Sequence, residues 1–233
     1  MPFSCSPKME ILFDNAIRKA APELEVILVE ATISNPPTSD ALWSEITAME
    51  QNIHDNIPME LVRHRPAIDA TRKAYKACGK DPNRYRPSAE ALCRRAVKGM
   101  ELYRTLTAID LINLLSMATG HSIGGFDADK IEGTALTLGI GTHNEPYEAI
   151  GRGELNIEGL PVYRDKTGGI GTPTSDNERT KLSPETRHLV MTINMYGSDP
   201  DYPAERVISL TERLLTQYAG ASHITARLIK ANE

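Results

Sequence analysis

The sequence predicts an α+β fold in which helices lie outside mixed β-sheets. Helical patterns dominate the first half of the chain, whereas short strands and glycine-rich loops dominate the second half. The absence of a repeating βαβ pattern favours segregated helices and strands over a doubly wound parallel sheet. With 233 residues and 40% hydrophobic content, the chain is long enough to bury a proper core. We expect a single domain over residues 1–233.

The N-terminal portion, residues 1–64, predicts both helix and strand. Apolar residues at helical spacing predict a helix over residues 8–20, and a β-branched run predicts a strand over residues 24–33. Ser39 and Asp40 then supply an N-terminal cap for a helix that ends near residue 53.

The remaining chain divides into a core portion, residues 65–194, and a C-terminal portion, residues 195–233. Glycines in adjacent positions predict a tight turn at Gly124–Gly125, because glycine tolerates positive φ. Periodicity and punctuation predict helices over residues 66–78, 88–100, 106–118 and 203–218, and strands over residues 135–138, 162–164, 189–194 and 223–229.

Cysteine usage and hydropathy indicate a cytoplasmic protein. The cysteines at positions 5, 78 and 93 are odd in number and lack CxxC spacing, which fits a reducing compartment. The sequence opens without a signal-peptide pattern, and no apolar run approaches membrane-spanning length. We therefore expect neither secretion nor contact with a membrane.

Positive charge is concentrated in one segment. The whole chain carries a net charge of −5, but residues 72–104 carry +7, so the rest carries −12. Such asymmetry suggests a face that binds an anion, for which RNA backbone is the leading candidate. The alternative is a pair of solvated helical faces, and charge alone leaves both interpretations open.

Three polar residues interrupt the apolar run at residues 106–118. Thr107, Asp110 and Asn113 are spaced by three, so neighbouring pairs share a helix face. A helix this apolar is expected to be buried, and buried Asp or Asn side chains need hydrogen-bond partners. These residues therefore either pin a neighbouring loop or line a polar pocket, and the residues alone favour the structural role.

A second candidate element is the segment 167–180, which is rich in glycine and hydroxyl side chains. It lacks the ending of a phosphate-binding P-loop, although its backbone N–H groups and hydroxyls could hold an ester carbonyl, a phosphate or an amino group. The chain has no G-x-S-x-G elbow, no paired cysteine and histidine, and no HExxH spacing. We expect neither a metal nor a cofactor.

These motifs together resemble one family. Asp110-x-x-Asn113 on an apolar helix, then a glycine, then Phe126-Asp127 and a lysine, is similar to the editing module of the bacterial phenylalanyl-tRNA synthetase beta subunit. The resemblance covers roughly residues 65–194. It implies two mixed sheets with outer helices and a pocket between the signature helix and segment 167–180.

The chain departs from the family pattern at several functional positions. Gly124 stands where the family has its editing histidine, and His121 occupies the position of the family's glutamine. Residues 172–176 replace a Gly-hydrophobic-Met-Gly-Gly segment. Glu154 is the nearest candidate for the glutamate that recognises a tyrosine hydroxyl, with Glu158 as the alternative.

The resemblance implies two functions for a stand-alone domain. The first is binding of aminoacyl-tRNA with hydrolysis of mischarged tRNA in trans; the second is non-catalytic binding of a small amino-acid-like ligand, such as a free amino acid. Synthetase activity is not expected, because the motifs that bind ATP are not recognisable. The residues assigned by the resemblance are His121, Asn113 and Glu154 in catalysis, Asp110, Gly124, Gly125, Thr172, Thr174 and Ser175 in substrate binding, and Arg94, Arg95 and Lys98 in RNA binding.

Overall fold

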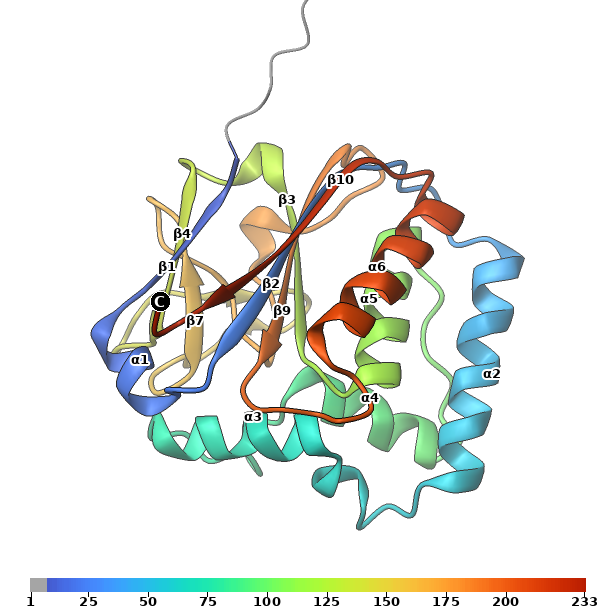
Figure 1. The fold of residues 1–233 in the computed structure, drawn as a ribbon, viewed down its shortest axis with the longest axis horizontal. Coiled ribbons are helices and arrows are strands. Elements are labelled where there is room, and N and C mark those ends of the chain that lie inside the picture. Colours follow the sequence, from blue (N-terminus) through green and yellow to red (C-terminus); the bar gives the residue numbers. More distant parts are fainter. Residues whose placement is uncertain (1–7) are drawn as a thin grey trace, which may run out of the picture.

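The chain folds into a layer of helices, a central sheet and a second sheet (Figure 1). This arrangement comes from a computed structural model that describes residues 8–233, so Cys5 lies outside the described residues. The α+β fold class expected from the sequence is confirmed, with helices α2, α5 and α6 on one side of the central sheet and strands β1, β4 and β7 on the other. The helices are α1 (Asn15–Ala20), α2 (Asp40–Asn56), α3 (Pro66–Ala77), α4 (Ser88–Val97), α5 (Thr107–Thr119) and α6 (Ala204–Ala219).

The central sheet has the strand order β10-β2-β9-β3, and all of its pairs are antiparallel. Its strands come from all three portions of the chain, so residues 1–64, 65–194 and 195–233 share one sheet. Strand β3 is at the edge of this sheet. The strands are β2 (Glu25–Thr32), β3 (Ile123–Asp127), β9 (His188–Met195) and β10 (Ser222–Lys230).

The second sheet has the order β1-β4-β7-β8, in which β1 and β4 are parallel. A small hairpin formed by β5 and β6 lies between β4 and β7 in the sequence. The strands are β1 (Glu10–Phe13), β4 (Ala135–Ile140), β5 (Glu148–Ala149), β6 (Gly153–Glu154), β7 (Pro161–Arg164) and β8 (Gly169–Gly171). Short 3₁₀ turns occur at Val62–His64, Ala128–Lys130 and Glu178–Thr180.

Strand β9 separates two hydrophobic cores because its side chains alternate between the faces of the sheet. Met191 and Ile193 point into the core shared with α2, α4, α5 and α6. Val190 points into the core between the two sheets, together with Phe126. The apolar helix α5 is therefore enclosed by the sheet and neighbouring helices.

Two sequence predictions in this region are wrong. Residues 8–20 form strand β1 and the short helix α1 rather than one helix, because Ile11 and Phe13 alternate with exposed residues and face the inter-sheet core. Asp14 separates the two elements by accepting the N–H of Ile17 at 2.7 Å, as an N-terminal cap. Gly124–Gly125 lies inside β3 and forms no turn.

Asp110 pins α5 to the segments that precede α2 and α5. Its buried carboxylate accepts hydrogen bonds from Thr38 Oγ1 at 2.5 Å, from Thr105 N–H at 2.8 Å and from Thr105 Oγ1 at 2.7 Å. Hydrogen bonds to a charged group are stronger than neutral ones, and buried donors are costly to leave unpaired. Asp110 therefore has the structural role that its spacing on an apolar helix favoured.

We predict that Asp110→Ala lowers the free energy of unfolding by about 2–4 kcal/mol, because three donors lose their charged acceptor. Asn113→Ala is the matched control on the same helix. Asn113 is half-buried and its side chain makes no hydrogen bond within residues 8–233, so Asn113→Ala is expected to lower the free energy of unfolding by about 1 kcal/mol or less. Urea unfolding followed by circular dichroism measures both; equal losses would contradict this assignment of Asp110.

Candidate functional site

The candidate site lies at the free edge of β3, where two glycines replace side chains. A Cβ on Gly125 would lie 2.4 Å from Ile112 Cδ1 of α5, and a Cβ on Gly124 would lie 2.7 Å from Phe126 Cζ. Both distances are too short for real atoms, so larger residues would force their neighbours apart. Glycine at these positions lets α5 approach one face of the strand while Phe126 and Thr192 approach the other.

Asp176 covers the free edge of β3. The N–H of Gly125 donates to Asp176 Oδ2 at 3.1 Å, which satisfies a backbone donor that the edge strand would otherwise leave open. Burial raises the pKa of Asp176 to about 7, and the hydrogen bond from Gly125 only partly opposes this effect. The carboxyl group therefore titrates near neutral pH, as a general acid or base requires.

The turn 172–176 places Asp176 by closing on itself. Thr172 Oγ1 accepts the N–H groups of Thr174 at 3.2 Å and Ser175 at 3.1 Å, and it donates to Ser175 O at 2.9 Å. Thr172 therefore acts within the turn, and Ser175 is the half-exposed hydroxyl beside Asp176.

Three neighbouring elements anchor this turn. The Tyr75 hydroxyl of α3 is 2.9 Å from Thr174 Oγ1, and the Tyr147 hydroxyl donates to Ser175 O at 2.7 Å. The N–H of Ser88, at the start of α4, donates to Pro173 O at 2.8 Å. The segment expected to be one loop over residues 167–180 instead contains β8 and a 3₁₀ turn, so the turn 172–176 is held firmly in place.

Asn113 lies on α5, the helix that packs against β3 at Gly125. Ile112, its neighbour in sequence, is the α5 residue nearest Gly125, and Asn113 is half-buried. Of the residues predicted for the site, Asn113, Gly124, Gly125, Thr172, Thr174 and Ser175 thus lie on elements that meet at β3.

His121 lies apart from this edge. It precedes Gly125 by four residues, about 13 Å along an extended chain. Its side chain is fully buried, and neither ring nitrogen has a hydrogen-bond partner within residues 8–233. Burial lowers the pKa of His121 to about 4 despite the opposing charge of Asp199. The imidazole is neutral at pH 7 and closed to solvent in this conformation.

Glu154 lies on the β5–β6 hairpin and is exposed. Its strand pairs Glu154 with Glu148, and the hairpin reaches the turn through the N–H of Ile150, which donates to Asp176 O at 3.0 Å. Within residues 8–233, no hydrogen bond or ion pair joins Glu154 to His121 or Asn113. The same holds for Glu158, the alternative to Glu154, whose side chain is paired with His143. The three residues expected to act in catalysis are therefore not gathered at one point.

A polar cluster that the sequence analysis missed lies behind Gly124. Thr192 Oγ1 and the Tyr196 hydroxyl are buried without hydrogen-bond partners within residues 8–233, while the Tyr163 hydroxyl donates to Asn194 Oδ1 at 2.7 Å. Thr192, Asn194 and Tyr196 occupy alternate positions at the end of an apolar strand. That alternation was a sequence signal for polar groups facing one side of the sheet. Asp176 had a weaker sequence signal, because it is marked only as the carboxylate at the end of a hydroxyl-rich segment.

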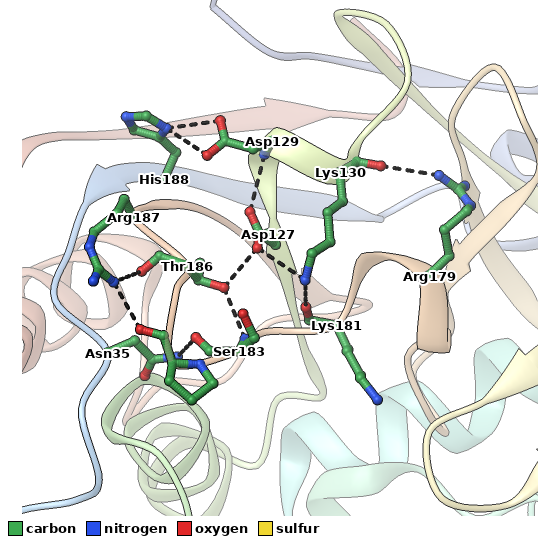
Figure 2. A network of polar contacts seen from close by, with 11 residues as sticks. Asn35, Asp127, Asp129, Lys130, Arg179, Lys181, Ser183, Thr186, Arg187 and His188 are labelled. Atoms are coloured by element: carbon green, nitrogen blue, oxygen red, sulfur yellow. Dashed lines mark hydrogen bonds and ion pairs between the residues drawn. The ribbon is translucent and has the colours of Figure 1, made fainter.

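The Phe-Asp-x-Asp-Lys motif has a structural role after β3 (Figure 2). Asp127 accepts the Thr186 hydroxyl at 2.8 Å and lies 3.2 Å from Lys130 Nζ. Lys130 also donates to Lys181 O at 2.9 Å, and Thr186 accepts the N–H of Ser183 at 2.9 Å. These contacts tie the segment after the turn 172–176 to the end of β3.

Many cations of the basic segment have internal partners. Glu90, buried in α4, forms an ion pair with Arg72 at 2.7 Å and lies 3.5 Å from Arg86 and 3.6 Å from Arg94. Arg95 donates to Glu101 O at 2.8 Å and stacks over Tyr103. Among the residues predicted to bind RNA, Arg95 and Lys98 have no carboxylate partner in the described part of the chain, and Lys98 is the exposed one of the two.

Two further structural findings concern metals and membranes. Within residues 8–233, no three His, Cys, Asp or Glu side chains are grouped closely enough to hold a metal ion. In the same part of the chain, no helix combines the length and the apolar character needed to cross a bilayer.

Comparisons with known proteins give a family and one similar structure. The family model of the B3/4 domain, which is found in the phenylalanyl-tRNA synthetase beta subunit, matches residues 70–212. One similar solved structure is an N-terminal fragment of the phenylalanyl-tRNA synthetase beta-subunit from Pyrococcus horikoshii, with 12% identity and a TM-score of 0.47. The match covers 96% of this chain and 53% of that one, so this chain spans about half of the fragment's length. No curated protein matches the chain.

We predict that Gly125→Ala lowers the free energy of unfolding by about 1–3 kcal/mol, because its Cβ overlaps Ile112 Cδ1. Ile112→Val removes that methyl group, so the double variant should lose less free energy of unfolding than the two single variants lose together. Urea unfolding of the four proteins in a double-mutant cycle measures the coupling. Strictly additive losses would show that this contact does not cause the loss of stability in Gly125→Ala.

Asp176 should make stability depend on pH. Folding raises its pKa from 3.8 to about 7, so the folded chain binds this proton more tightly than the unfolded chain. Stability is therefore lost as pH rises from about 4 to about 7. Relative to Asp176→Asn, which keeps an acceptor for Gly125, the wild type should lose on the order of 3 kcal/mol across this range. Urea unfolding from pH 4 to pH 8 tests this; parallel curves for the two proteins would refute it.

Proposed function

The chain belongs to the B3/4 domain family, and from this membership we propose that it binds aminoacyl-tRNA and hydrolyses mischarged tRNA in trans. The observation that supports this function best is the meeting of α5, Gly125 and Asp176 at the free edge of β3. There a carboxyl group with a pKa of about 7 lies beside the two glycines of the strand, which have no side chains.

The aminoacyl group would lie against this edge. Gly125 itself is buried against Ile112 and Asp176, so the substrate would meet the half-buried polar groups around it. Asn113, from α5, supplies an amide that has no hydrogen bond within residues 8–233, and Ser175 supplies a half-exposed hydroxyl. Both can hold the ester and the amino group, so that catalysis rests mainly on positioning.

In the proposed reaction, Asp176 acts as the general base. Its carboxylate takes a proton from water as the water oxygen attacks the ester carbonyl carbon. Collapse of the tetrahedral intermediate breaks the bond to the ribose oxygen, which takes the proton back from Asp176. The products are a free amino acid and uncharged tRNA. Asn113 is kept from the predicted catalytic residues, and Asp176 takes the place of His121 and Glu154, because Asp176 and Asn113 lie on elements that meet at β3.

RNA would reach this edge along α4. The first turn of α4 contacts the turn 172–176 through Ser88, and Lys98 follows its last turn. Ten residues of helix separate these points by about 15 Å. The cations Arg94, Arg95 and Lys98 are thus placed to meet the phosphates of two or three nucleotides that precede the aminoacylated end.

The second candidate function is a non-catalytic binding module for a small amino-acid-like ligand. The complete burial of His121, together with glycine at position 124, favours it. In that case the groups at β3 would bind a free amino acid without activating water.

The decisive measurement is the deacylation of Tyr-, Phe- and Ala-charged tRNA by the purified chain. Asp176→Asn and Asn113→Ala should each reduce the rate constant by about 100-fold, the range for loss of a general base or a key donor. The wild-type rate should rise with pH through an apparent pKa near 7, as Asp176 becomes ionised.

The matched control is Glu148→Gln, which neutralises an exposed carboxylate on the nearby hairpin and should leave the rate unchanged. Hydrolysis that survives Asp176→Asn with an unaltered pH profile would remove Asp176 from the mechanism. No hydrolysis of any charged tRNA, combined with saturable binding of a free amino acid, would establish the binding module instead.

A further inference from the structure

A second concave site lies away from the edge of β3. It is a cavity of about 500 Å³, within the size range of small-molecule pockets. Its walls are the end of α3, the polar loop that follows it, the end of β4 and the segment before β7. The residues around it include Lys80, Asp81, Arg84, Tyr85, Asn156 and Glu158.

Lys80 builds the inner wall of this cavity. Its side chain is almost completely buried, and Nζ donates to Asn156 O at 2.9 Å and to Glu158 O at 2.5 Å. The same ammonium group lies 3.7 Å from the centre of the Tyr85 ring. Lys80 therefore fixes both the aromatic ring and the opposite wall, so the cavity is preformed.

Arg84 is the uncommitted cation at this cavity. Arg72, Lys73, Arg86, Arg94 and Arg104 of the same basic segment all have carboxylate partners. Arg84 is exposed, and within residues 8–233 it has neither an ion pair nor a hydrogen bond. Its guanidinium lies 5.7 Å from the centre of the Tyr85 ring.

We propose that this cavity binds one unpaired ribonucleotide, with its phosphate on Arg84 and its base against Tyr85. A guanidinium binds phosphate with two parallel hydrogen bonds, and an aromatic side chain accepts any base by stacking. A free phosphate ion would fill only a small part of the volume and would leave Tyr85 unused. Tyr85 is half-buried and lines the cavity wall, so part of its ring faces a ligand there.

The acidic residues in the lining are compatible with this ligand. Glu158 Oε2 is paired with His143 at 3.1 Å, and Asp81 Oδ1 accepts the N–H of Asn83 at 2.9 Å. Carboxylates accept hydrogen bonds, so Asp81 suits the hydroxyl groups of a ribose. Its second oxygen has no partner within residues 8–233.

The cavity and the edge of β3 share a support. Tyr75 and Tyr147, which hold the turn 172–176, belong to a small hydrophobic cluster on which Tyr85 also packs. A nucleotide in the cavity and an aminoacyl group at β3 would therefore both rest on this cluster. The inference rests on the proposed function only for the natural ligand, an RNA; the binding of a free nucleotide is independent of hydrolysis.

The test is isothermal titration of the full chain with adenosine 5′-monophosphate, ribose 5-phosphate, adenosine and inorganic phosphate. The monophosphate should bind at least about tenfold more tightly than each fragment, because it uses both Arg84 and Tyr85. Arg84→Gln and Tyr85→Leu should each weaken its binding by about tenfold or more. Lys76→Ala, which removes an exposed cation of the same segment outside the cavity lining, should change the dissociation constant by less than about twofold.

Three results would overturn the proposal: no binding of the monophosphate at millimolar concentration, equal losses in Arg84→Gln and Lys76→Ala, or binding of inorganic phosphate as tight as that of the nucleotide. Circular dichroism checks that both cavity variants are folded. Because Arg84 is exposed, Arg84→Gln is expected to disturb folding less than Tyr85→Leu. Nucleotide binding without any deacylation would defeat the proposed hydrolysis alone. Deacylation without nucleotide binding would defeat this cavity alone.

Discussion

The structure depends on the close packing around Gly124 and Gly125 in the edge strand β3. Ile112 of α5 occupies the space on one face, Phe126 and Thr192 occupy the other, and Asp176 takes the backbone donor at the free edge. A side chain at Gly125 would push α5 away from the central sheet, and a side chain at Gly124 would displace Phe126 or Thr192. The same absence of side chains lets Asp176 reach the backbone N–H of Gly125, so one constraint serves both packing and the proposed site.

Elements with strong local signals could be predicted from the sequence, and those that depend on distant partners could not. Ser39 capping and apolar periodicity located α2 to within a few residues, and Gly120 ended α5 in a left-handed conformation, as glycine does after helices. Strand β1 was missed because its partner strand, β4, lies more than 120 residues later in the chain. Gly124–Gly125 has turn composition but lies in a strand because β9 pairs with it.

The candidate site was predictable only in part, for a similar reason. Residues on α5, β3 and the turn 172–176 were found because each carries a local motif. His121 was chosen by its position in a motif, which contains no information on burial, and the fold places it in the interior. Asp176 is defined by the backbone of Gly125, 51 residues earlier in the chain, and by its burial; neither can be read from neighbouring residues.

The positive charge around α4 depends on both the composition of the segment and the ion pairs of Glu90. A buried carboxylate at Glu90 neutralises Arg72, but it cannot neutralise Arg86 and Arg94 as well, and both lie at longer distances from it. The start of α4 therefore keeps surplus positive charge while its guanidinium groups are held in place by Glu90. An arginine that is already ordered loses less conformational entropy when it binds a phosphate than a free surface lysine does. Internal ion pairs and anion binding are thus compatible in the same segment, since the pairs fix the direction of the charges that remain.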